Sequence, residues 1–127
     1  MDVTDKRIIE IFEKYPGSEL EERVGMWGEE DLDEGETWLD AVISEAEHLE
    51  ELYHDGSFGE DLKYAREVLR DIKNGFNLVM DFKTMQIKDR HSKSEVAWAE
   101  REIQNYNNLK KMIRAFKKLK EKEKVAE

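Results

Sequence analysis

One stretch constrains the fold of this chain more than any other, because residues 92–124 contain neither glycine nor proline. Ser92 and Glu95 have the spacing of a capping box, which marks the start of a helix. Apolar residues then recur at helical intervals. We therefore predict a helix of roughly thirty residues, about 45 Å long at 1.5 Å per residue, near the C-terminus.

The apolar residues of this helix change face partway along it. At 100° per residue, Val96, Ala99, Ile103 and Tyr106 lie on one face, and a second group lies on another. That second group consists of Leu109, Met112, Ile113, Phe116 and Leu119. The change falls at residues 104–108, which are mostly mediocre helix formers, so we predict a bend or break there.

The two faces suggest two roles. We predict that the first packs against acidic helices of the N-terminal half and that the second points outward, as a partner surface or a homodimer contact. The predicted partner-binding residues of this helix are Leu109, Lys110, Met112, Arg114, Phe116, Lys117 and Leu119.

Shorter helices precede the long one. Helical spacing predicts them over residues 4–15, 18–27, 34–53 and 62–72, and the last two should pack as an antiparallel hairpin because their connection is short. For residues 76–91 we predict an extended or irregular connection. A short β excursion over 76–88 is the alternative, because apolar residues alternate at the start of this segment. The predicted fold class is all-α, with about five helices.

Length and composition bound the organisation of the chain. Its 127 residues suit one helical domain over 1–127, and we expect residues 119–127 to be a frayed tail. The absence of cysteine excludes disulfides and thiolate sites. No apolar run approaches the roughly 20 residues of a membrane span, and the N-terminus does not read as a signal peptide, so we expect a cytoplasmic protein without a membrane partner.

Charge is divided unevenly along the sequence. Residues 1–71 carry 23 acidic and 7 basic side chains, a net charge of −16, whereas residues 72–127 carry 8 and 14, a net charge of +6. The two halves can attract each other within the fold, or either can meet a partner. A net charge of −16 over 71 residues resembles the charge density of proteins that imitate the nucleic-acid backbone, and it suits a basic partner. The densest segment has six carboxylates in the eight residues 29–36. The predicted acidic partner face is Glu29, Glu30, Asp31, Asp33 and Glu34.

Paired carboxylates on two helices raise the possibility of an enzyme. The set is Glu47, Glu50, Glu51, Glu67 and Asp71. It resembles the acidic motifs of all-α, magnesium-dependent nucleoside-triphosphate pyrophosphatases, but the second motif has Glu-x-x-x-Asp where that family has Glu-x-x-Asp. All of these residues except Glu50 fall on the polar sides of their helices, so a solvated face is favoured and the hydrolase is an alternative. Glu45 lies within an apolar arc and predicts a structural ion pair.

Histidines and basic residues add little chemistry. Glu45 with His48, and Glu51 with His54, spell Glu-x-x-His on a single helix, whereas di-iron sites need two facing helices. His91 sits in a polar loop, and no Ser-His-Asp, P-loop or dinucleotide pattern occurs. We predict no catalytic residue, metal or cofactor. The remaining alternative is nucleic-acid binding through Lys110, Lys111, Arg114, Lys117 and Lys118, which otherwise form a solvated face.

Three segments resemble small helical proteins of unknown function encoded by phages and prophages. They are residues 45–56, 60–75 and the Asn-Tyr-Asn-Asn-Leu-Lys of 105–110, together with the intervening chain about half of the sequence. The resemblance implies a mobile-element origin and a protein that binds a host protein or a nucleic-acid-processing complex. Anti-CRISPR inhibitors are one such class. Together with the charge pattern, it predicts a non-enzymatic inhibitor or adaptor.

Overall fold

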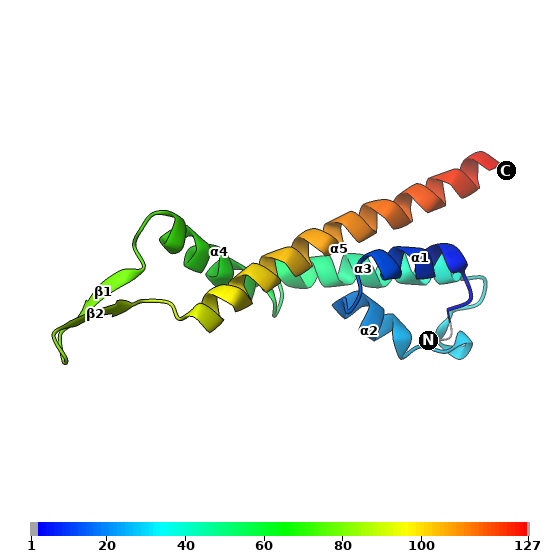
Figure 1. The fold of residues 1–127 in the computed structure, drawn as a ribbon. Coiled ribbons are helices and arrows are strands. Elements are labelled where there is room, and N and C mark those ends of the chain that lie inside the picture. The colour runs from blue at the N-terminus through cyan, green and yellow to red at the C-terminus, as the bar shows by residue number, and fades with distance from the viewer. Residues whose placement is uncertain (1–2, 127) are drawn as a thin grey trace. The chain divides into compact units, whose positions relative to one another are not determined.

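The long C-terminal helix is present as α5, Lys93–Ala126, in a computed structural model that describes residues 3–126 (Figure 1). The Ser92 hydroxyl accepts a hydrogen bond of 3.2 Å from the backbone N–H of Glu95, as the capping signal predicts. The predicted break over residues 104–108 is absent. Mediocre helix formers cost only a few tenths of a kcal/mol each, which packing on both sides of the segment overrides.

The described chain divides into two units, and one boundary falls inside α5, between Asn105 and Tyr106. This boundary coincides with the predicted change of apolar face. The all-α class is confirmed, with five helices and a small two-stranded antiparallel sheet among the described residues. The single domain and the frayed tail stay predictions, although α5 continues past Leu119 to Ala126.

The first unit contains the chain up to Leu52 and from Tyr106 onward. Its elements are α1 (Lys6–Lys14), α2 (Glu19–Gly25), the 3₁₀ turn η1 (Glu29–Asp31), most of α3 (Trp38–His54) and the second half of α5. Helix α3 begins four residues later than predicted. The Thr37 hydroxyl accepts a 3.2 Å hydrogen bond from the N–H of Asp40 and donates one of 2.9 Å to its carboxylate, and this exchange caps the helix.

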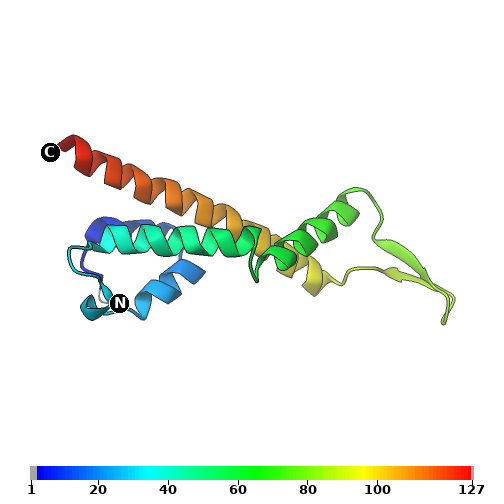
Figure 2. The ribbon, with the colours of Figure 1, turned by 180° about the vertical axis from the view of Figure 1, so that it is seen from behind.

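The core of the first unit joins α1, α3 and the second half of α5 (Figure 2). Phe12 and Phe116 are fully enclosed, and their rings meet edge to face with centroids 5.7 Å apart. An ion pair also joins α5 to α3 at the surface, where the Lys120 ammonium lies 2.5 Å from the Asp40 carboxylate. A basic residue of α5 thus pairs with an acidic residue of the N-terminal half, as expected if the two oppositely charged halves attract each other within the fold.

The second unit, Tyr53–Asn105, contains α4 (Gly59–Lys73), β1 (Leu78–Asp81), β2 (Gln86–Asp89) and the first half of α5. Ala65, Val68 and Ala99 form its small buried cluster, which joins α4 to α5. Most of α3 belongs to the other unit, so the antiparallel pairing predicted for α3 and α4 stays a prediction.

The two strands form a hairpin that extends beyond the ends of α4 and α5 within the second unit (Figure 1). The register pairs Leu78 with Asp89 and Met80 with Ile87. The alternative prediction of a β excursion is therefore confirmed. None of the described helices has both the length and the apolar character needed to cross a membrane.

Candidate functional site

The hairpin exposes an apolar row on one face. Residues paired directly across antiparallel strands point to the same side, so Leu78, Met80 and Ile87 share a face, and Phe82 and Met85 lie in the turn that joins the two strands. We define the hairpin surface as Leu78, Met80, Phe82, Met85 and Ile87. Their exposed fractions are 67%, 43%, 81%, 69% and 67%. Such a row would normally be covered in a folded protein.

One member of the hairpin surface has an unfavourable backbone conformation. Met85 is left-handed, with a φ of 56°, and it is the one non-glycine residue with positive φ among residues 3–126. The left-handed region costs roughly 1–2 kcal/mol for most side chains, and glycine or asparagine adopts it more readily. Residues held in such conformations cluster at active sites, ligand clamps and switch regions.

The opposite face of the hairpin carries Val79 and three polar residues, Asp81, Gln86 and Lys88. The Lys88 ammonium lies 3.0 Å from the carboxylate of Asp81, and Gln86 pairs with Asp81 across the strands. The Lys88 ammonium and the backbone N–H of Lys83 both donate hydrogen bonds to the Asp81 carboxylate, and they hold its pKa below the ordinary value. The hairpin is therefore amphipathic, with one face satisfied by its own ion pair and the other open.

The base of the hairpin is tied to both helices of its unit by His91. This side chain is only 6% exposed, and its Nε2 lies 2.8 Å from Asp71 of α4 while its Nδ1 lies 2.7 Å from Glu95 of α5. The Tyr64 hydroxyl donates to the same Glu95 carboxylate. Asn77, just before β1, accepts a 2.9 Å hydrogen bond from the N–H of His91 through its side-chain oxygen.

We call His91, Asp71, Glu95 and Tyr64 the His91 clamp. Its opposite charges attract one another. A carboxylate beside each ring nitrogen favours the charged imidazolium form of His91. Hydrogen bonding to Asp71, opposed by burial and assisted by Glu95, raises the pKa of His91 above its ordinary value. Hydrogen bonds from Tyr64 and His91 lower the pKa of Glu95.

This arrangement suits a structural role better than catalysis or metal binding. Both ring nitrogens are already engaged, so no lone pair faces a substrate or an ion. Within residues 3–126 no three side chains of the metal-binding types converge on one point. No buried side-chain nitrogen or oxygen of the described residues lacks a hydrogen-bond partner either.

The apolar partner surface predicted on α5 is wrong for most of its members. Leu109, Met112 and Phe116 are 5%, 0% and 0% exposed, and Leu119 is partly buried. Helical periodicity identifies an apolar face but not what covers it, and here the first unit covers it with its own residues. These side chains stabilise the fold and are not available to a second molecule.

The basic members of the same set are only partly engaged. Lys110 lies over the Tyr106 ring at 4.7 Å, and Lys117 lies 3.6 Å from Glu47. The Arg114 guanidinium donates to the Lys110 carbonyl at 3.4 Å, within its own helix. Lys117 therefore contributes to the fold through a partner in its own unit.

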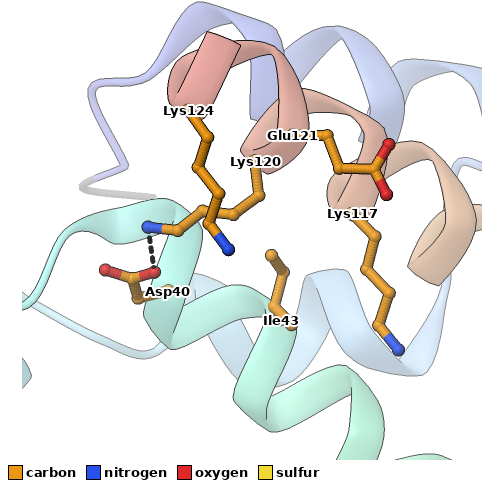
Figure 3. A pocket seen from close by; sticks show the side chains of 6 residues that line it. All are labelled: Asp40, Ile43, Lys117, Lys120, Glu121 and Lys124. Atoms are coloured by element: carbon orange, nitrogen blue, oxygen red, sulfur yellow. Dashed lines mark ion pairs between the residues drawn. The ribbon is translucent and has the colours of Figure 1, made fainter. Parts of the chain in front are cut away.

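A shallow groove of about 350 Å³ lies between α3 and the last turns of α5 (Figure 3). The ion pair between Lys120 and Asp40 crosses it, and Lys124 and Lys117 flank it. A lysine that already neutralises a carboxylate in the groove leaves little net attraction for an anion. The groove carries no recognisable chemistry.

The predicted acidic face lies in the exposed η1 turn and the loop that follows it. Glu29, Glu30, Asp31, Asp33 and Glu34 are all exposed. None of them forms an ion pair with another described residue. The Asp31 carboxylate accepts a 2.8 Å hydrogen bond from the N–H of Gly28, which shapes the turn. We call these five residues the acidic loop.

The other carboxylates behave as structural groups. Glu45 is paired with Arg23 at 3.1 Å, which confirms the predicted ion pair of a partly buried glutamate. Of the set compared with the pyrophosphatases, Glu47 lies near Lys117 and Asp71 binds His91. Two of the five are thus already occupied.

Sequence reasoning missed the His91 clamp and treated His91 as part of a polar loop. The i, i+4 spacing of His91 and Glu95 at a helix start was a usable signal, but the contact with Asp71 joins residues twenty positions apart. No protein family, curated protein or solved structure matches this chain. The resemblance to phage-encoded proteins stays a prediction.

Proposed function

We propose that this chain acts without catalysis, by binding other macromolecules, as an inhibitor or adaptor directed at a host protein or a nucleoprotein complex. One observation supports this most strongly. The hairpin surface presents five large apolar side chains, between 43% and 81% exposed, on a segment that no helix of its unit covers. Apolar patches of this kind mark interaction sites.

The acidic loop supplies a second binding surface in the proposal. Five exposed carboxylates within six residues create a strongly negative field in the first unit. Such a field accelerates encounter with a basic protein surface, including one that holds nucleic acid. A positively charged channel of a nucleic-acid-processing protein is therefore the partner class that we assign to the acidic loop.

The polar groups around His91 support binding over catalysis. Asp71, His91, Glu95 and Tyr64 satisfy one another, whereas a general acid or base needs an open position next to a substrate. Among residues 3–126 no specific contact favours the pyrophosphatase alternative or nucleic-acid binding through α5. Magnesium with a panel of nucleoside triphosphates tests the first, and the salt dependence of binding tests the second.

The proposal is tested by retention of a partner on the immobilised full chain from bacterial lysate. We expect a stoichiometric partner that is retained by the wild type and lost when acidic-loop carboxylates become amides. The changed residues are Glu29, Glu30, Asp33 and Glu34. The matched control neutralises four exposed carboxylates elsewhere, Glu10, Glu13, Glu22 and Glu51.

The retained partner should also show function. Its nuclease or other nucleic-acid-processing activity should fall when the wild-type chain is added in equimolar amount, and the control variant should inhibit equally. A lysate that yields no stoichiometric partner, or a partner that binds both variants equally, would contradict the proposal.

A further inference from the structure

We infer that the hairpin surface binds the same surface of a second copy of this chain, face to face and with the two hairpins antiparallel. This pairing rests on the proposed function, because both require the hairpin surface to be a binding surface. It leaves the acidic loop of each copy free for another partner. A two-fold dimer would then present two acidic loops to a basic target and bind it with added avidity.

The hairpin needs a second layer. A two-stranded sheet is marginally stable in water unless its apolar face packs against something. Here the polar face has its own ion pair between Lys88 and Asp81, whereas the apolar row with Met80 and Ile87 at its centre has no cover within its unit. Two sheets commonly stack about 10 Å apart through such faces.

The area of the hairpin surface is sufficient for a dimer. Large apolar side chains present on the order of 150 Å² each when fully exposed, so five at the observed exposed fractions offer on the order of 500 Å² per copy. Two copies would bury on the order of 1,000 Å², which is near the lower limit for a specific interface. The pairing is therefore a moderate, concentration-dependent one.

Charge at the two ends of the row favours a second copy over an unrelated protein. Asp89 stands opposite Leu78 at the base, and Lys83 stands in the turn at the tip. Neither side chain forms an ion pair with another residue in the described part of the chain. Antiparallel stacking about a two-fold axis brings the Asp89 of each copy near the Lys83 of the other, so the surface complements itself.

The first measurement is the mass of the purified full chain by sedimentation velocity and light scattering across the micromolar range. We expect the mass to rise with concentration from that of the 15.1 kDa chain toward twice that value. A constant monomer mass up to the highest concentration would overturn the pairing.

Two matched variants locate the interface. Ile87→Lys places like charges face to face in the dimer and should weaken association roughly tenfold or more. Gln86→Lys adds the same charge one residue away, on the polar face and opposite Asp81, and should leave association unchanged. Equal association by wild type and both variants would place the contact elsewhere and overturn the inference. Circular dichroism checks that each variant is folded.

A charge exchange tests the antiparallel geometry through exposed residues. Lys83→Asp and Asp89→Lys should each weaken the dimer, and the double variant should recover most of the loss. Losses that simply add would exclude the antiparallel arrangement. A monomeric chain whose lysate partner is lost with Ile87→Lys would overturn the pairing and leave the proposed function intact. A dimer that retains no other macromolecule would support the pairing and refute the proposed function.

Discussion

Replacing Phe116 with alanine tests whether the second apolar face of α5 is core or docking surface. Phe116 is fully enclosed and meets Phe12 edge to face at 5.7 Å. Deleting a buried phenylalanine side chain removes its burial and leaves a cavity, so we expect a loss of about 3–5 kcal/mol in the free energy of unfolding. This is a large part of the 5–15 kcal/mol typical of a small protein.

Urea denaturation followed by far-UV circular dichroism measures this loss. A cycle with Phe12→Leu and Phe116→Leu should add a coupling of about 0.5–1.5 kcal/mol, the usual value of an aromatic pair beyond its buried area. The control is Lys118→Ala, at an exposed position of the same helix, which should change stability by less than about 0.5 kcal/mol. A Phe116→Ala effect as small as that of the control would refute the assignment of this face to the core.

Three further predictions concern the surface and the His91 clamp. The folded pKa of His91 is raised above 6.5, so its contribution to stability is present below pH 6.5 and is lost as the pH rises through the folded pKa. The folded pKa of Glu95 is lowered below 4.5, so its contribution is present above pH 4.5 and is lost as the pH falls through the folded pKa. The stability difference between wild type and His91→Gln should therefore be largest between pH 4.5 and 6.5 and should shrink at alkaline pH, and urea titrations across pH would show no such trend if the ring were neutral. Met85→Asn should relieve backbone strain worth up to about 1 kcal/mol, seen as slower hydrogen exchange of hairpin amides, and should weaken self-association by removing an apolar contact. Lys120→Ala removes a partly exposed ion pair with Asp40 and should cost no more than about 1 kcal/mol, with a smaller loss in high salt; a salt-independent loss would point to packing instead.

Local signals account for most of the helical architecture. The Ser18 and Ser92 caps form with the predicted residues, because a side-chain oxygen and an N–H three residues away meet without help from the rest of the chain. The change of apolar face along α5 also follows from local geometry, and it lies at the boundary between the units. Helix α3 begins later than the sequence predicts, because the acidic segment before Thr37 resembles a helix start.

The hairpin was only partly predictable. Leu78, Met80 and Phe82 alternate as in a strand, but β2 contributes Ile87 as its sole large apolar residue and reads weakly by itself. Strand β2 forms because it pairs with β1 through backbone hydrogen bonds, which the side chains of β2 alone do not predict. The apolar row becomes visible only once the register is known.

The helical class, the long C-terminal helix, its change of face and the division of charge all follow from the amino-acid sequence, because helical period and net charge depend on residues close together in the chain. Which apolar residues are covered depends on the packing of the folded chain. That packing encloses Phe116, leaves Ile87 and Met80 exposed, and brings Asp71 to His91. Burial and pairing depend on contacts between distant segments, and a linear pattern identifies an apolar or charged face without identifying what meets it.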